Sequence, residues 1–282
     1  MHVILWLVAC SLLTLPSIAF SKNATLMLTA HILHIDQNSR SGVIHVINDG
    51  DRTGVFELRW IDHIMSESGK LQTWNDPAQS PWSLQPYARF SPRRITLKPS
   101  ESQVVRVVLK PKSRTAPLGE YFSHLRILTI NSNLEETLKE QQNKVSKNVD
   151  SGITINAKIG MSIPVIWRNS DDKQKATIEF KRIDVASNDD NKSEPVKDEM
   201  LLKVTRHGLI STRGYIHVFI KKNGNREQII GPHPFNIYAN IESLELRLKM
   251  PEQYPSNGEF LVLYSDAKDN TDNIISSVTI TY

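Results

Sequence analysis

Apolar and polar residues alternate with a period of two along most of the chain. Such alternation is typical of a strand that buries one face and exposes the other. Clusters of Gly, Pro, Asn and Asp interrupt it, as expected for turns between short strands. The first set of alternating segments comprises Ser41–Asn48, Val55–Met65, Ile95–Leu97, Val104–Leu109, Tyr121–Ile130 and Ile153–Trp167. This set predicts an antiparallel β-sandwich.

A second set of alternating segments follows a polar stretch, Asn169–Lys175, which we interpret as a short linker. It comprises Thr177–Val185, Met200–Thr205, Tyr215–Lys221, Gln228–Tyr238, Leu244–Met250, Phe260–Tyr264 and Ser276–Tyr282. Seven strands in roughly 110 residues match one immunoglobulin-like sandwich in size. The chain is therefore predicted to be all-β, with two immunoglobulin-like β-sandwich domains at residues 22–168 and 169–282.

The first 21 residues have a different character from the rest of the chain. Val3–Leu15 is almost entirely apolar, Pro16 ends the run, and Ser17–Ala19 supplies small residues at the spacing of a cleavage site. The run lacks the preceding Lys or Arg that usually leads a signal peptide. It is also too short to span a membrane as a helix. Residues 1–21 are therefore predicted to be a secretory signal peptide, and the protein to be exported.

Cys10 is the only cysteine, and it lies in this leading segment. Leu7–Cys10 resembles the cleavage box of a bacterial lipoprotein, but so short a stretch before it disfavours processing there. We therefore interpret Cys10 as an apolar residue of the removed peptide. The mature chain would then have no thiol, which excludes disulfides, thiolate metal sites and cysteine nucleophiles. It would also lack the Cys…Trp…Cys pattern of an animal extracellular immunoglobulin domain.

The formal net charge is +4, and basic residues are interleaved with acidic ones. Together with export, this interleaving argues against nucleic acid as a partner. A mildly positive face for a carboxylate-bearing partner remains compatible with the charge.

A search for catalytic or metal-binding patterns finds none in the sequence. Among the nine histidines, His31 and His34 are three apart on an expected strand, so they would point to opposite faces. HExxH, GxSxG and phosphate-cradling glycine loops do not occur. We therefore expect no enzyme activity, no cofactor, no metal and no small-molecule substrate.

The longest alternation covers residues 153–165, where Ile, Ala, Met and Val alternate with Thr, Asn, Lys, Gly, Ser and Pro. It can be interpreted as the last strand of the first sandwich, with its apolar face inward. It is, however, longer than a usual strand, and one sandwich can cover only part of it. The remainder would leave apolar residues on a free edge, which invites pairing with another chain. Pro164 agrees with an edge position.

Several short motifs occur in order along the mature chain: Ser91–Pro99, Gln103–Arg106, Gly119–Tyr121 with His124 and Leu125, Ser162–Arg168, and Arg206–Gly208 with Ser211 and Gly214. With these motifs the sequence resembles the PapD-like periplasmic chaperones of chaperone–usher pilus assembly. The resemblance covers essentially the whole mature chain. The form of Ser162–Ile166 is similar to a divergent branch of that family.

The resemblance implies two immunoglobulin-like domains in a boomerang arrangement and a periplasmic chaperone without enzyme activity. Such a chaperone binds pilus or fimbrial subunits that lack their own last strand, lends them an edge strand, and delivers them to the outer-membrane usher. By position, the lent residues would be Ile153, Ile155, Ala157, Ile159 and Met161.

The resemblance departs from the family pattern at the carboxylate anchor. The best-known members hold the subunit's terminal carboxylate with an Arg on the first strand and a Lys on the last strand. The corresponding positions here are His31 and Pro164. Candidate anchors are therefore His31 itself, Lys158, Arg168 and Arg94, and the sequence does not choose among them.

Two other functions compete with the chaperone hypothesis. A structural cell-surface or pilus protein could also be built of immunoglobulin-like domains, but a pilus subunit would usually carry one incomplete sandwich and often a cysteine pair. An exported hydrolase would need a catalytic constellation that the sequence does not show.

Overall fold

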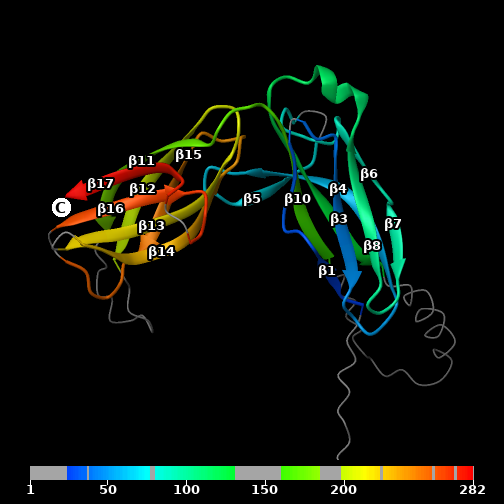
Figure 1. Ribbon diagram of the computed structural model, residues 1–282, viewed down its shortest axis with the longest axis horizontal. Helices are drawn as coiled ribbons and strands as arrows, with labels where there is room; N and C mark the ends of the chain where they lie inside the picture. Colours follow the sequence, from blue (N-terminus) through cyan, green and yellow to red (C-terminus); the bar gives the residue numbers. More distant parts are fainter. Residues whose placement is uncertain are drawn as a thin grey trace, which may run out of the picture.

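The computed structural model describes residues 24–36, 38–76, 80–130, 160–184, 198–222, 225–255, 258–269 and 272–281. These residues form 17 β-strands and a short 3-10 helix, η2 (Pro111–Thr115). Figure 1 shows the strands gathered into two bodies that lie at an angle to each other. The prediction of an all-β chain with two β-sandwiches is confirmed.

The first sandwich contains two sheets. One has the strand order β1-β3-β8-β6, and the other has the order β2-β10-β9-β4-β5, with β7 also paired to β4. Its strands are β1 (Leu26–Leu28), β2 (Leu33–Ile35), β3 (Ser41–Asn48), β4 (Gly54–Met65), β5 (Leu71–Trp74), β6 (Ala88–Ser91), β7 (Arg94–Leu97), β8 (Ser102–Leu109), β9 (Gly119–Ile130) and β10 (Gly160–Asn169).

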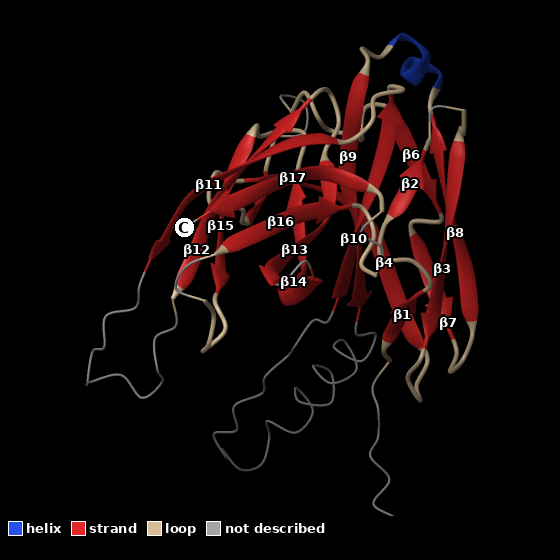
Figure 2. Ribbon diagram, turned by 60° about the vertical axis from the view of Figure 1, so that its left-hand side comes forward, coloured by secondary structure: helices blue, strands red, loops and turns tan. Residues whose placement is uncertain are grey.

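The second sandwich also contains two sheets, with the orders β11-β12-β15 and β14-β13-β16-β17. Its strands are β11 (Lys175–Asp184), β12 (Glu199–His207), β13 (Thr212–Lys222), β14 (Asn225–Ile237), β15 (Ser243–Lys249), β16 (Glu259–Ser265) and β17 (Ile274–Thr281). Figure 2 shows the strands of both sandwiches and places η2 at one end of the first. The strands of the two sandwiches belong to different sheets, so the linker Ser170–Gln174 leads from one to the other.

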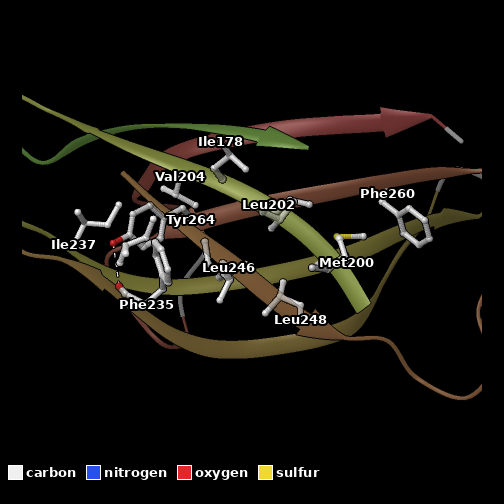
Figure 3. Packing of buried hydrophobic residues seen from close by; sticks show 14 of the residues in the cluster. Ile178, Met200, Leu202, Val204, Phe235, Ile237, Leu246, Leu248, Phe260 and Tyr264 are labelled. Atoms are coloured by element: carbon white, nitrogen blue, oxygen red, sulfur yellow. Dashed lines mark hydrogen bonds between the residues drawn. The ribbon is translucent and has the colours of Figure 1, made fainter. Parts of the chain in front are cut away.

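The alternation seen in the sequence builds a separate core in each sandwich. In the first, Ile44 and Val46 of β3 are fully buried against Phe56 of β4 and Leu125 of β9. In the second, Figure 3 shows the inward side chains of β12 and β15 facing those of β14 and β16. Tyr264 is buried there, and its hydroxyl donates to the carbonyl of Phe235 at 3.0 Å.

The two cores meet where the sandwiches touch. Met65, Phe122 and Ile166 belong to strands of the first sandwich, yet they are buried with residues of the second core. The rings of Phe122 and Tyr238 pack edge to face, with centroids 5.2 Å apart. The Asn240 side chain accepts from the Met65 N–H at 3.2 Å and donates to its carbonyl at 2.7 Å. The two sandwiches are therefore joined by packed side chains and hydrogen bonds as well as by the linker.

Candidate functional site

Strand β10 has one side that is only partly covered. It pairs with β9 along its whole length, from Gly160 opposite Leu128 to Asn169 opposite Gly119. On its other side it pairs with β2, in parallel, only from Val165 to Trp167. Within the part of the chain that the structure describes, residues 160–164 have no strand beside them on that side. These five residues form what we call the open edge.

Side chains of β10 alternate strictly between two faces. Ile163, Val165 and Trp167 point into the first core and are buried. Met161 continues this row within the open edge, and its surface is 37% exposed. Pro164 carries no N–H and lies on the open edge, in agreement with its expected edge position.

The predicted lent residues fall mostly outside the described part of the chain. Ile153, Ile155, Ala157 and Ile159 lie outside the described residues, and so does the candidate anchor Lys158. Met161 is described, and it occupies the same face of β10 as the buried core residues. The signal peptide predicted for residues 1–21, with Cys10, also lies outside the described residues.

The candidate anchors are not brought together. His31 is exposed and precedes β2 by two residues, so it lies close to the point where the open edge begins. It is not on the strand that was expected to carry both His31 and His34, because β2 starts at Leu33. Arg94 is exposed on β7 and is separated from β10 by β4 and β9.

The third anchor, Arg168, lies at the far end of β10 and already has a carboxylate partner. Its Nε donates to Glu120 at 3.0 Å, and the Glu120 side chain is 1% exposed. Arg168 also lines a hollow of about 630 Å³ next to the linker. Three carboxylates line the same hollow, Asp172, Asp266 and Asp272, and they make it unfavourable for another carboxylate. This setting favours a structural role for Arg168.

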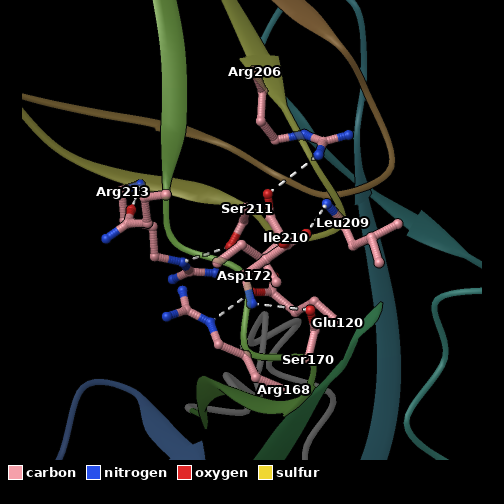
Figure 4. A network of polar contacts seen from close by, with 10 residues as sticks. Glu120, Arg168, Ser170, Asp172, Arg206, Leu209, Ile210, Ser211 and Arg213 are labelled. Atoms are coloured by element: carbon pink, nitrogen blue, oxygen red, sulfur yellow. Dashed lines mark hydrogen bonds and ion pairs between the residues drawn. The ribbon is translucent and has the colours of Figure 1, made fainter. Parts of the chain in front are cut away.

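A polar network at the junction surrounds this ion pair (Figure 4). Arg206 donates to the carbonyls of Gly208, Ile210, Ala239 and Ile241, and so fixes the turns at that end of the second sandwich. Arg213 lies over the Tyr238 ring, 5.0 Å from its centroid. Sequence reasoning missed these roles, because Ala239 and Ile241 are 33 and 35 residues from Arg206 and meet it only in the folded chain.

Two histidines are packed together beside the junction. The rings of His63 on β4 and His124 on β9 meet edge to face, with centroids 4.6 Å apart. Burial, together with the charges of His63 and Arg213, lowers the pKa of His124 to about 4. Burial also lowers the pKa of His63. Both rings are therefore neutral at pH 7.

The part of the chain that the structure describes offers neither a metal site nor a membrane-spanning helix. No group of three or more His, Cys, Asp or Glu side chains in that part of the chain could hold a metal ion. The described segments likewise contain no helix with the length and apolar character needed to cross a membrane.

The geometry thus defines a class of protein: two packed β-sandwiches, with an open strand edge on the first. No family model matches the chain, and no curated protein matches it. Three solved structures to which it is similar are of chaperones or their complexes. The first is a chaperone–tip adhesin complex of CFA/I fimbriae biogenesis, with 11% identity and a TM-score of 0.49 over 92% of this chain and 98% of that chain. The second is the CsuC–CsuE chaperone–tip adhesion subunit pre-assembly complex from archaic chaperone-usher Csu pili of Acinetobacter baumannii, with 13% identity and a TM-score of 0.48 over 92% of this chain and 98% of that chain. The third is the YadV chaperone, with 8% identity and a TM-score of 0.47 over 91% of this chain and 99% of that chain. At such identities and TM-scores the likeness does not carry function over to this chain.

Proposed function

We propose that the chain is an exported, periplasmic chaperone of pilus assembly, of the PapD-like family, that holds a pilus subunit against the open edge of β10. The observation that carries the proposal is the open edge itself. Among the residues that the structure describes, none pairs with the backbone of 160–164 on the side that β2 leaves uncovered. Proteins normally cover or blunt such edges, because they template pairing with another chain. An edge kept open for a partner strand is the arrangement of β-augmentation.

The sequence motifs support the same interpretation. Ser162–Arg168, one of the motifs behind the family resemblance, forms most of β10. Gly119–Tyr121, another of them, begins β9, the strand that holds β10 in place. One of these segments therefore contributes Ser162–Pro164 to the open edge, and the other pairs with the far end of the same strand.

The apolar row of β10 supplies the binding energy in this proposal. Met161 shares a face with the buried Ile163, and the sequence alternation continues this row back through Ile159, Ala157, Ile155 and Ile153. Burying one Ile side chain in a subunit groove contributes roughly 1.5–3 kcal/mol. Ordering of the strand and loss of free motion oppose this gain. Three such side chains are enough for a stable complex.

The remaining parts of the proposal concern export, anchoring and delivery. Export would use the leading segment 1–21, and delivery would take the complex to an outer-membrane usher. Among the candidate anchors that the structure describes, His31 is the one whose position supports the role, because it lies close to the start of the open edge. Lys158 remains a second candidate from the sequence.

The proposal predicts that a charge in the apolar row blocks subunit binding without unfolding the chaperone. Met161→Glu should lower subunit binding at least tenfold, since tenfold corresponds to about 1.4 kcal/mol and a carboxylate in an apolar groove costs more. Met27→Glu is the matched control, because Met27 is 46% exposed on β1 in the other sheet. The assay is co-purification of N-terminally tagged pilus subunits from a bacterial periplasm, followed by titration.

Ile155→Glu extends this test along the strand, with Thr154→Glu on the opposite face of the alternation as its control. We expect Ile155→Glu to abolish binding and Thr154→Glu to disturb it far less, while both proteins keep the melting temperature of the parent. If Met161→Glu and Ile155→Glu unfold the chain, the residues belong to an ordinary core and the edge is not a binding site. A parent chain that binds no subunit and forms polymers instead would favour a structural surface protein.

A further inference from the structure

Two arginines face each other on neighbouring strands of the first sandwich. Arg59 on β4 and Arg126 on β9 are direct cross-strand partners, so both side chains project from the same face of the sheet. Arg59 donates to Glu57 at 2.7 Å. Arg126 has no ion pair among the described residues, and its Nε is buried without a hydrogen-bond partner.

This arrangement is unfavourable in the free chain. Like charges directly opposite each other destabilise a pair of strands. A buried guanidinium N–H without an acceptor is desolvated without forming a hydrogen bond, which costs free energy. Arg94 lies opposite Glu57 on β7 and adds a third cation to the same region. The hydrogen bond from Arg59 lowers the pKa of Glu57, and the charges of Arg94 and Arg126 lower it further. The carboxylate of Glu57 is therefore within electrostatic range of all three guanidinium groups, and its hydrogen bond is with Arg59.

The unpaired arginine lies beside the open edge. Arg126 is directly opposite Ser162 of β10, and Ser162 is small, exposed and part of the open edge. A strand added to that edge would lie about 4.8 Å from β10 and about 10 Å from β9. The side chains of an Arg on β9 and of an Asp or Glu on the added strand can meet across that distance, because the residue of β10 between them in the register is the small Ser162.

We propose that the partner strand carries an Asp or Glu beside Ser162, and that its carboxylate binds Arg126, with Arg59 next to it. The inference rests on the proposed function, because it needs a strand paired with the open edge. It requires an acidic side chain in the partner strand, in addition to the apolar side chains that pack with the apolar row of β10. The carboxylate supplies the acceptor that Arg126 lacks and offsets the repulsion between the two guanidinium groups.

The free protein gives the first test. Arg126→Gln removes the repulsion and retains a polar side chain, so its melting temperature should equal or exceed that of the parent. An arginine with a merely structural role would lower the melting temperature when replaced. A clear fall in the melting temperature of Arg126→Gln overturns the proposal.

The complex gives the second test, with the subunit that co-purifies with the parent as the probe. Arg126→Gln should weaken its binding at least tenfold and reduce the salt dependence of the affinity. Arg106→Gln is the matched control, because Arg106 is exposed on β8 in the other sheet of the same sandwich. Arg126→Glu should lose binding further, and changing one acidic residue of the subunit strand to Lys should restore it.

The outcomes separate this inference from the proposed function. If the parent binds no subunit, the proposed function fails, and this inference fails with it. If the parent and Arg126→Gln bind the subunit equally well, the proposed function stands and the arginine site is overturned. If no single acidic-to-Lys change in the subunit strand restores Arg126→Glu, but amidation of the subunit's terminal carboxylate abolishes binding, the carboxylate is not carried by a strand side chain and the proposal is wrong.

Discussion

His124 is a titratable side chain held in a place that disfavours its charge. It lies on β9 with 4% of its surface exposed, against the ring of His63. Its pKa falls to about 4 because burial removes the water that would stabilise the imidazolium, and because His63 and Arg213 are close. In the unfolded chain the same ring has its ordinary pKa of 6.5. Protonation of His124 therefore destabilises the folded state relative to the unfolded state.

The stability of the fold is expected to fall as the pH drops from 6.5 to 4. In that range the unfolded chain binds a proton at His124 and the folded chain does not. Above pH 7 both states are neutral at this residue, and its contribution does not change with pH. The full loss is on the order of 3 kcal/mol. Urea unfolding of the parent and of His124→Gln at pH 7.5, 6 and 5 measures it, and parallel pH dependences would contradict the prediction.

Some residue-level features followed from the sequence and others did not. The inward residues of the strands were predictable, because period-two alternation places every second side chain on one face. The partnership of Glu120 with Arg168 was not, because the two residues are 48 positions apart and meet only after β9 and β10 pair. The unpaired state of Arg126 depends in the same way on the register of β4 and β9.

Among the elements, length decides what the sequence could predict. Ser41–Asn48 and Val55–Met65 agree with β3 and β4 to within one residue, and the seven strands expected in the second sandwich are present. The short strands β1, β5 and β6 were missed and the bounds of β2 were not predicted, since three or four residues show little alternation. Yet β2 is the element that limits the open edge, so the site could not be delimited from the sequence.

Strand β13 depends on a glycine where it approaches β16. A Cβ atom on Gly214 would clash with the carbonyl oxygen of Ser265, a backbone atom that cannot rotate away. Gly214→Ala is therefore expected to destabilise the protein by about 2–3 kcal/mol. Gly42→Ala is the control, because the atoms nearest to its Cβ would be Cδ1, Cδ2 and Cγ of the Leu33 side chain, which can shift more easily than a backbone carbonyl. It should cost less than about 1 kcal/mol, and equal costs in thermal unfolding would argue against a backbone clash at Gly214.

At the scale of the whole molecule, the junction fixes how the two sandwiches face each other. The packing of Met65, Phe122 and Ile166 with the second core is apolar and non-directional. The two hydrogen bonds between Asn240 and the backbone of Met65 are directional. The angle between the two sandwiches in Figure 1 therefore depends on a small number of directional hydrogen bonds in addition to apolar packing.

Asn240→Ala should loosen the junction without unfolding either sandwich. The Met65 amide would lose its acceptor, so we expect its hydrogen exchange to become at least tenfold faster, while exchange in the centre of β13 stays unchanged. A second sign would be a wider distribution of particle shapes in small-angle X-ray scattering. If exchange at Met65 is unaltered, apolar packing alone holds the sandwiches together.

The three residues of β2 act as a fixed end point. Leu33 occupies the place beside Val165, so a strand arriving from outside can occupy the edge only as far as Pro164. An incoming chain cannot slide past this stop, and a slip by one residue would reverse which of its side chains face the groove. The end of β2 at Leu33 would therefore fix the register of a guest strand, so that each of its residues pairs with one defined residue of β10. A partner would be selected for the distance between its own end and its apolar residues as well as for their size.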